Sequence, residues 1–389
     1  MDTVSITQPG NGQFELISGE DLKNYPIWQR VFADACKDHR YYEIIEQTLE
    51  CGFEHRYFVL KDSAGDVQAV QPIFFVRQNL VEGLRGKTRA LVELIRKRFP
   101  RFLTMRVLMV GCAAGEGHLG AASSESALRL SAALHSNLET IARGEKASLI
   151  VLKDFPWEYR RALACFFGNG YTRIPSMPLT RLELNYANFE EYLSSLGKAT
   201  RKGLRRKFRK AEQSGPIELQ IVNDISPYVE EIYPLYLQVH ERSPLKFETL
   251  TQDYFCRLGQ EMAERTRFFL WRRSGQIVAF SLCFVHGDTI YDECLGMDYR
   301  VALDLHLYFY TLRDIISWAL EQRLRYYCST PLNYDPKLHL KCNLVPLDLY
   351  VRHTAPLLNP IFGRAVKYLG PTRHDPVLRQ FPNADVMLN

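Results

Sequence analysis

Two stretches of the chain carry the same order of apolar and polar positions. In the second half, apolar residues fill 267–273 and 276–286, and Ser274-Gly275 separates them, which predicts an antiparallel hairpin with a tight turn. Helical spacing of apolar residues follows from Leu303 to Ala319. In chain order, the elements predicted after the hairpin are a strand over 289–297, this helix, a strand over 326–329, a short helix over 334–342 and a strand over 345–351.

The first half repeats this order. A hairpin is predicted over 56–61 and 67–76 across the turn Ser63-Ala-Gly-Asp66, and HRYFVLKDSAGDVQAVQPIFFV aligns with TRFFLWRRSGQIVAFSLCFV with the turns in register. The elements predicted after it are a strand over 106–110, a helix over 124–143, a strand over 147–153, a helix over 157–168 and a strand over 173–184. A period near half the chain length indicates a duplicated domain. The predicted fold class is α/β (α+β), with two tandem units that each hold a mixed, mostly antiparallel sheet flanked by helices.

The repeat predicts one domain boundary, with a first unit over 1–185 and a second over 186–389. An insertion near 79–103 interrupts the first unit, and apolar residues alternate there with basic ones. One interpretation is a helix that lies on an anionic membrane surface, and the other is a solvated helix that packs its apolar side on the domain. A connector helix near 195–213 opens the second unit.

Basic residues are concentrated in these two segments, although the net charge is only +5. Eight lysines and arginines lie between Arg85 and Arg106 with the single acid Glu93, and eight more lie between Lys198 and Lys210 with no acid. Such blocks indicate an anionic partner, namely cofactor phosphates, an RNA or a lipid surface. A solvated helix face is the alternative for the second block.

The compartment predicted from composition is the cytoplasm. The sequence has no run of eighteen apolar residues and no basic, apolar start that would indicate a signal peptide. Nine cysteines, an odd number without a C-x-x-C pair, favour a reducing compartment. If the insertion binds lipid, a peripheral position on the inner face of the membrane is expected.

A glycine-rich loop, GCAAGEGHLG, joins a strand to a helix at residues 111–120. Gly111, Gly115 and Gly117 are candidates for binding cofactor phosphate, because glycines let backbone N–H groups face a loop-bound anion and a helix N-terminus attracts it. The alternative is a tight strand-to-helix turn without ligand. His118 in this loop is a candidate proton donor to a leaving group.

Acidic candidates lie near the corresponding place in the second half. Asp292 and Glu293 are expected on opposite faces of a strand, so that one at most faces a cleft. Glu293 is the candidate general base for an amine, since burial beside apolar residues raises a carboxyl pKa. Asp304 is a candidate catalytic acid or a helix N-cap, and His306 follows it.

A third group of candidates follows the strand that is predicted to end near Ser329. Tyr334 is a candidate proton donor to a leaving group. Lys337 and Lys341, four residues apart on one helix face, suit a phosphate or carboxylate. The alternative is that Tyr334 packs in the core and both lysines are solvated. Metal-ligand spacing and a Ser-His-Asp order are absent from the sequence, so neither a metal nor a serine nucleophile is expected.

The predicted order of hairpin, strand, loop, helix, strand, helix and strand resembles the GNAT acyltransferase unit. The duplication, with the connector KATRKGLRRKFRKAEQSG, resembles the Fem-type (FemAB-like) peptidoglycan transferases over about residues 25–370. NYDPKLHLKCNLVPLDLYV is similar to the segment in which these proteins enter their last helix before a proline-bearing strand. The family's phosphate loop has Arg or Gln at the place of Cys112, and this chain keeps its two glycines only in the first unit.

The resemblance implies an N-acyltransferase without a metal. Its donor would be acyl-CoA or an acyl carrier protein, and its acceptor the amine of an envelope or lipid precursor. One alternative is a Fem-type transferase that uses aminoacyl-tRNA gripped by the block at 198–210. The other is a catalytically inactive tandem GNAT protein that acts as a binding module.

Overall fold

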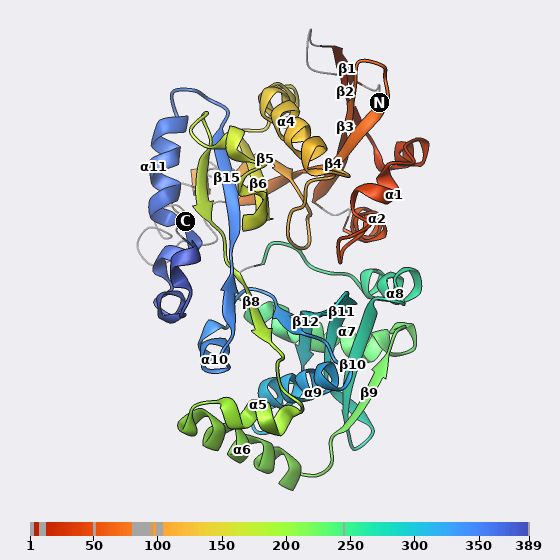
Figure 1. Ribbon diagram of the computed structural model, residues 1–389, viewed down its shortest axis with the longest axis vertical. Coiled ribbons are helices and arrows are strands. Elements are labelled where there is room, and N and C mark those ends of the chain that lie inside the picture. The colour runs from red at the N-terminus through yellow and green to blue at the C-terminus, as the bar shows by residue number, and fades with distance from the viewer. Residues whose placement is uncertain are drawn as a thin grey trace. The chain divides into compact units, whose positions relative to one another are not determined.

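The computed structural model describes residues 4–7, 13–49, 52–79, 94, 96–98, 104–243 and 246–387. It divides the chain into two compact units, each assembled from two separate parts of the sequence (Figure 1). Unit 1 contains Met1–Ser176 and Leu347–His374, and unit 2 contains Met177–Pro346 and Asp375–Asn389. Most of the insertion near 79–103 lies outside the described residues.

Unit 1 is built on an eight-stranded mixed sheet. Its strands, in spatial order, are β1 (Val4–Thr7), β2 (Gln13–Ile17), β3 (Phe53–Lys61), β4 (Val67–Asn79), β5 (Thr104–Val110), β6 (Leu149–Pro156), β15 (Leu347–His353) and β7 (Thr172–Pro175). Its α-helices are α1 (Trp28–Val31), α2 (His39–Thr48), α4 (Ser124–Gly144) and α11 (Asn359–Leu369). Only β5 and β6 pair in parallel among these strands as described.

Unit 2 repeats this arrangement on a seven-stranded sheet. Its strands, in spatial order, are β9 (Glu218–Val222), β10 (Thr266–Arg273), β11 (Gln276–His286), β12 (Thr289–Met297), β13 (Tyr326–Ser329), β8 (Leu179–Glu183) and β14 (Asn343–Val345). Its α-helices are α5 (Phe189–Ser195), α6 (Lys198–Gln213), α7 (Val229–Arg242), α8 (Gln252–Glu261), α9 (Leu307–Glu321) and α10 (Tyr334–His339). The parallel pair is β12 with β13.

The two units exchange one strand each. The chain leaves unit 1 at its edge strand β7 and enters the sheet of unit 2 as β8, and it leaves unit 2 at its edge strand β14 and enters the sheet of unit 1 as β15. The single strand predicted over 173–184 is therefore two strands, interrupted at Ser176–Pro178 and placed in different sheets. The strand predicted over 345–351 is divided in the same way at Pro346, because proline cannot donate the ladder hydrogen bond of a central strand. A single boundary at residue 185 does not describe this organisation.

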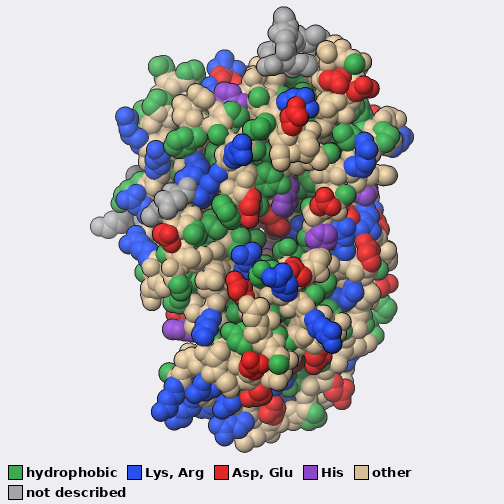
Figure 2. Space-filling view, viewed as in Figure 1, with side chains coloured by type: hydrophobic (Ala, Val, Ile, Leu, Met, Phe, Trp, Pro, Cys, Tyr) green, Lys and Arg blue, Asp and Glu red, His purple; other side chains and the backbone are tan. Residues whose placement is uncertain are grey.

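The core of unit 2 fixes α6 and α9 against the sheet. Apolar residues of α9, including Ile315 and Ile316, pack with Leu204 and Phe208 of α6 and with Trp271 of β10. Trp271 is fully buried, and its indole N–H donates to Asp314 of α9 over 2.8 Å. The opposite side of α6 bears lysines and arginines, which gather at the lower end of the view in Figure 2.

Candidate functional site

The parallel strands β12 and β13 pair only over their first residues, and a β-bulge lies where they part. Thr289 to Asp292 pair with Tyr326 to Ser329, after which β13 ends while β12 continues. On the other side of β12, Cys283 of β11 pairs with Asp292 and Leu282 with Cys294, so Glu293 is the extra residue of a bulge. A bulge redirects side chains at this place in the strand. The end of β13 is therefore where β12 presents Asp292.

Two hydroxyl groups hold the Asp292 carboxylate. Ser281 Oγ donates to Oδ1 over 2.5 Å, and Tyr327 Oη donates to Oδ2 over 2.7 Å. Burial raises the pKa of Asp292, and hydrogen bonds from Ser281 and Tyr327 together with the charge of Lys337 oppose that shift. The carboxylate is thus a fixed acceptor that favours positive charge near it.

Lys337 is the charged side chain of this cluster that lies deepest. It projects from the short helix α10, its residue is 7% exposed, and its Nζ donates to the carbonyl of Thr330 over 2.5 Å. Burial lowers the pKa of Lys337 to about 8, although nearby Cys342 and Asp292 favour its charged form. A lysine with such a pKa exists in both protonation states near neutral pH, which is the property required of a general acid or base.

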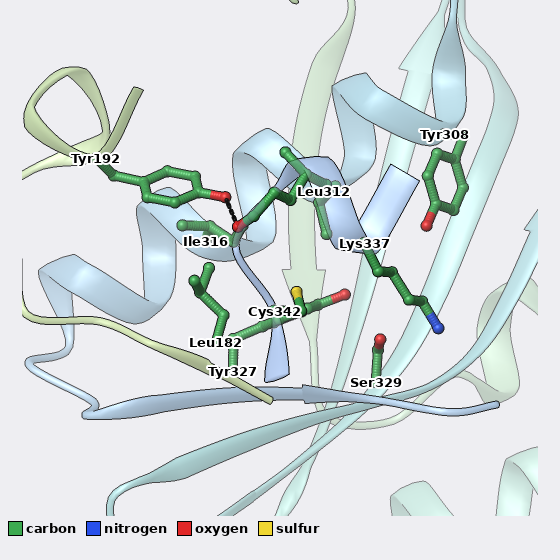
Figure 3. Close-up of a pocket in the computed structure, with 10 residues that line it drawn as sticks. Leu182, Tyr192, Tyr308, Leu312, Ile316, Tyr327, Ser329, Lys337 and Cys342 are labelled. Carbon is green, nitrogen blue, oxygen red and sulfur yellow. Dashed lines mark hydrogen bonds between the residues drawn. The ribbon is translucent and has the colours of Figure 1, made fainter. Parts of the chain in front are cut away.

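A small cavity of about 10 Å³ lies beside Lys337, with room for about one water molecule. Figure 3 shows the Lys337 amine, the Ser329 hydroxyl and the Tyr308 hydroxyl on the same side of this cavity, and aliphatic side chains such as Leu312 and Ile316 at the other side. Ser329 shares a 2.9 Å hydrogen bond with Thr180 of β8, so the exchanged strand helps to position it. Burial raises the pKa of Tyr308, which therefore stays a protonated donor.

The arrangement can move a proton in a site of low polarity. An amine of lowered pKa, a fixed carboxylate and a phenol lie where two parallel strands diverge. Electrostatic interactions are stronger in such a site than in water. These residues can accept a proton from a nucleophile and return it to a leaving group, and this chemistry requires no metal.

Of the residues that the sequence singled out, Lys337 lies in this cluster and Glu293 lies at its edge. Glu293 is partly buried on the bulge of β12, next to Asp292. The bulge interrupts the regular alternation of faces on which the expectation for these two acids depends. Lys341 follows α10 with a left-handed backbone (φ 62°) and is exposed. It does not share the buried environment of Lys337.

Tyr334 packs in the core of unit 2. It is 3% exposed, its hydroxyl donates to the carbonyl of Pro178 over 2.8 Å, and its ring meets Phe381 edge to face. This hydrogen bond ties α10 to the segment that enters β8. The role of Tyr334 here is to position α10, and thereby Lys337.

Asp304 and His306 lie apart from the cluster, next to the basic helix α6. The Asp304 side chain is exposed and lies 4.0 Å from Lys210 Nζ. His306 adopts a left-handed backbone (φ 49°) just before α9, which begins at Leu307 rather than at Leu303. Burial lowers the pKa of His306, and Lys210, Lys207 and Arg206 lower it further. The N-cap residue of α9 is His306, so Asp304 does not cap this helix.

The glycine loop of unit 1 is packed between β4 and β6. The amide of Gly111 donates to Pro72 over 3.1 Å and that of Gly117 to Asp154 over 3.0 Å, so these two N–H groups are engaged within the protein. The carbonyl of Gly115 accepts from Lys153 Nζ over 2.9 Å. Hydrogen bonds within unit 1 thus engage the N–H groups of Gly111 and Gly117 and the carbonyl of Gly115.

His118 belongs to a buried polar network of the same loop. Its Nδ1 lies 3.2 Å from Tyr159 Oη, and its Nε2 lies 3.9 Å from Glu116, which forms a 2.9 Å ion pair with Lys37. Burial raises the pKa of Glu116, but the interactions with Lys37 and His118 lower it by more. The pKa of that carboxyl therefore lies well below its usual range. In the described structure His118 is thus part of the packing of unit 1.

Sequence reasoning missed four polar side chains of the cluster: Ser281, Tyr308, Tyr327 and Ser329. Each lies within a run of apolar or aromatic residues, where the pattern predicts core packing. The one available signal was the polar pair Asp292 and Glu293 inside an otherwise apolar strand.

A comparison with models of known protein families gives a match within unit 2. Residues 198–337 match the family model described as an acetyltransferase (GNAT) domain. Over these residues the chain is similar to the GNAT family. The match includes α6, the sheet strands β9 to β13 and Lys337 itself.

The fold is similar to that of a solved structure named FemX. The two are 13% identical, the similarity covers 93% of this chain and 100% of that one, and the TM-score is 0.52. A tandem GNAT protein from the clavulanic acid biosynthesis pathway is also similar, at 10% identity, with 88% of this chain and 99% of that one covered and a TM-score of 0.49. The predicted fold class, with two units that each hold a mixed sheet flanked by helices, is confirmed.

A curated relative is a "Putative 8-amino-7-oxononanoate synthase 2" of Mycobacterium tuberculosis, in two strains. It is 23% identical over 310 residues, which is 77% of this chain. The chain spans about 40% of the length of these relatives.

Two further features concern the part of the chain that the structure describes. No helix there is both long and apolar enough to cross a bilayer. No group of three or more His, Cys, Asp or Glu side chains within the same residues is arranged to hold a metal ion.

Proposed function

We propose that this protein is an N-acyltransferase that moves an acyl group from a thioester, acyl-CoA or an acyl carrier protein, to the amine of an acceptor, which we take to be an envelope or lipid precursor. Unit 2 performs the chemistry, and Lys337 is its central residue. The observation that carries the proposal is the coincidence of a GNAT family match with a buried lysine of lowered pKa where the parallel strands diverge. The family match supports the class of reaction, and the lysine supports a mechanism.

In the proposed reaction, the acceptor nitrogen attacks the thioester carbonyl carbon and the uncharged Lys337 amine accepts the proton that this nitrogen loses. The C–S bond then breaks, and the leaving thiolate takes a proton from the Lys337 ammonium. Asp292 balances the transient positive charge, and a water molecule in the small cavity can relay the proton. Lys337 ends in the protonation state in which it began.

This mechanism fixes the direction of the pH dependence. Because the pKa of Lys337 is lowered to about 8, the amine is largely protonated below pH 8 and cannot accept a proton. We expect the rate to rise with pH and to level off above pH 8.

The test is thiol release from acetyl-CoA and long-chain acyl-CoA in the presence of a panel of amines. We expect Lys337→Met to reduce the rate by about 100-fold or more, as loss of a general base does. Lys246→Met, at an exposed lysine of unit 2, is the control and should keep the wild-type rate. Unchanged turnover in Lys337→Met would exclude Lys337 from the chemistry. Lys337→Arg should be as inactive as Lys337→Met, since arginine stays protonated.

A second candidate is a transferase that takes its acyl group from aminoacyl-tRNA. Exposed basic residues of α6 favour it, because a row of positive charge on one helix suits the phosphates of an RNA. The two candidates differ in donor, and thermal stabilisation by acyl-CoA or by charged tRNA distinguishes them. A shift with neither donor, combined with tight binding of another ligand, would favour a non-catalytic binding module.

A further inference from the structure

The exposed side of α11 in unit 1 combines large apolar side chains with positive charge. Helix α11 packs on β15 and β7 through Phe362, whose ring meets His353, and through Gly363, which lies against Thr172. Its other side is open to solvent: Leu357 just before the helix is 89% exposed, and Ile361 is 64% exposed. Tyr368, seven residues after Ile361, lies on the same face of the helix and is 63% exposed.

Neighbouring residues extend this apolar face. Leu358 is exposed beside Leu357. The turn that precedes β7 adjoins the start of α11, because Asn359 Nδ2 donates to the carbonyl of Gly170 over 2.7 Å, and Phe167 in that turn is also exposed. We name the set Phe167, Leu357, Leu358, Ile361 and Tyr368 the α11 face. Half of the ten large apolar side chains that are exposed in the described structure belong to it.

The segment that carries α11 bears charge of one sign, although Arg352 near its start is ion-paired with Glu139 of α4. From Leu349 to His374 the sequence has four lysines and arginines and no acid: Arg352, Arg364, Lys367 and Arg373. Arg364 and Lys367 are exposed on α11, between Ile361 and Tyr368. In Figure 2, blue and green side chains are interspersed along the flank on which α11 lies.

We infer that the α11 face docks unit 1 onto an anionic lipid bilayer. A helix that lies in the membrane interface needs exposed large apolar side chains and flanking lysines or arginines, without acids that anionic lipid would repel. The α11 face meets each requirement. A second copy of this chain suits the face less well, because a symmetric contact would bring the same positive charges together.

This inference does not depend on the proposed reaction, because it concerns only the attachment of the protein to a surface. A lipid-embedded acceptor would nevertheless meet an enzyme already held at the membrane.

The experiment is co-sedimentation of the full chain with vesicles of phosphatidylcholine alone and of phosphatidylcholine with 30% phosphatidylglycerol, at about 0.1 M salt. We expect binding only to the anionic vesicles. Leu357→Ser/Ile361→Ser should abolish it, and Arg364→Gln/Lys367→Gln should weaken it about 30-fold, because each basic residue near the surface contributes about a fivefold gain in affinity. Leu128→Ser, an exposed leucine of α4 in the same unit, is the matched control and should bind like wild type.

Failure of the wild type to bind anionic vesicles would overturn the inference. Equal binding by wild type and Leu357→Ser/Ile361→Ser would also overturn it, since another surface would then hold the lipid. A dimer in sedimentation velocity that the Leu357→Ser/Ile361→Ser variant disrupts would assign the face to a second copy instead. Equal melting temperatures of the variants ensure that loss of binding is not loss of folding.

Discussion

Asp292 shows how one carboxylate is kept in a place that disfavours its charge. Burial raises the pKa of Asp292, and the hydroxyls of Ser281 and Tyr327 oppose that shift by donating to its two oxygens. A hydrogen bond to a charged group contributes about 1.5 to 3 kcal/mol to the stability of the folded state. The pair of hydroxyl donors is therefore what allows a fixed negative charge beside Lys337.

Asp292→Asn tests this account through stability. The raised pKa means that the folded state binds more protons than the unfolded state between the ordinary carboxyl value of 3.8 and the folded value. The protonated Asp292 side chain therefore adds to wild-type stability, and this contribution falls as pH rises through the interval. Asparagine does not titrate, so the variant lacks this pH-dependent contribution. We expect the free energy of unfolding of Asp292→Asn, relative to wild type, to increase with pH from about pH 4.

Urea denaturation across this pH range measures the difference. Asp304→Asn, at an exposed aspartate of the same unit, is the matched control for the loss of one carboxylate. A difference between Asp292→Asn and wild type that stays constant with pH would contradict the raised pKa.

At this scale the sequence points to one residue of the candidate cluster, Lys337, although it predicts that this lysine binds a phosphate or carboxylate rather than carrying a proton. Lys337 was singled out because it follows a strand end in an α/β sheet, where ligands bind. The sequence points to Glu293 rather than Asp292, because alternation along a strand cannot reveal a bulge. The bulge depends on how β12 pairs with β11, and that pairing is a tertiary property. Tyr308 and Tyr327 look like core aromatics until their hydroxyl groups are placed.

Among the elements, the glycine loop of unit 1 and helix α6 show how the same residue type serves different purposes. Gly117 lies so close to β6 that an added Cβ would be 2.4 Å from the carbonyl oxygen of Lys153. Gly203 lies within α6, where a Cβ would meet nothing within 4 Å. Close packing therefore requires the first glycine, and the second only lowers helix propensity.

The paired substitutions Gly117→Ala and Gly203→Ala should move stability in opposite directions. We expect Gly117→Ala to destabilise by about 1 to 3 kcal/mol through overpacking. Gly203→Ala should stabilise by about 0.5 to 1 kcal/mol, the usual gain for alanine in a helix. Thermal unfolding checks both. If Gly117→Ala is neutral, the loop is mobile enough to move away from β6, and a role in binding phosphate returns to consideration.

Helix α6 should bind a polyanion in a salt-dependent way if the tRNA candidate is right. Lys202 and Arg206 are exposed on adjacent turns. Replacing both by alanine should weaken tRNA binding and reduce the slope of log affinity against log salt by about 0.7 to 0.9 for each phosphate that the helix no longer neutralises. Filter binding at several salt concentrations gives this slope. Arg129→Ala, at an exposed arginine of α4, is the control, and an unchanged slope in the α6 variant would remove α6 from RNA binding.

The hairpins were the most predictable elements, and the exchanged strands the least. Strand β11 and strand β12 begin and end where the apolar pattern placed them, because a tight turn and an apolar run are local properties. The sequence predicted a single strand over 173–184, since nothing local shows that residues 172–175 and 179–183 pair with different partners. Pro178 and Pro346 were the available signals, and each lies close to a crossing between units.

At the scale of the whole molecule, the strand exchange makes the two units depend on each other's sequence. Strand β15 lies between β6 and β7, so unit 1 has a gap in its sheet until residues 347–353 are in place. The fragment 1–185, which the repeat alone would suggest as a domain, lacks this strand. We expect it to show no cooperative thermal transition.

A rejoined unit is the matched control for this fragment. The amide of Ser176 donates to Leu347 over 2.8 Å, and β7 and β15 are antiparallel, so a short Gly-Ser linker can join residue 176 to residue 347 as a hairpin. We expect residues 1–176 linked to 347–374 to unfold cooperatively in circular dichroism. A cooperative transition in fragment 1–185 would show that β15 is dispensable.

The position of β15 also bears on how the protein is made. At about 5 to 20 residues per second, a ribosome needs roughly 10 to 35 s to travel from the end of β7 to the end of β15. During that interval the nascent first half displays two facing sheet edges that nothing yet covers, and unpaired edges are where chains join to wrong partners. Newly synthesised molecules therefore need protection, by chaperones or by the arriving second half, that a protein of two sequential domains would not require.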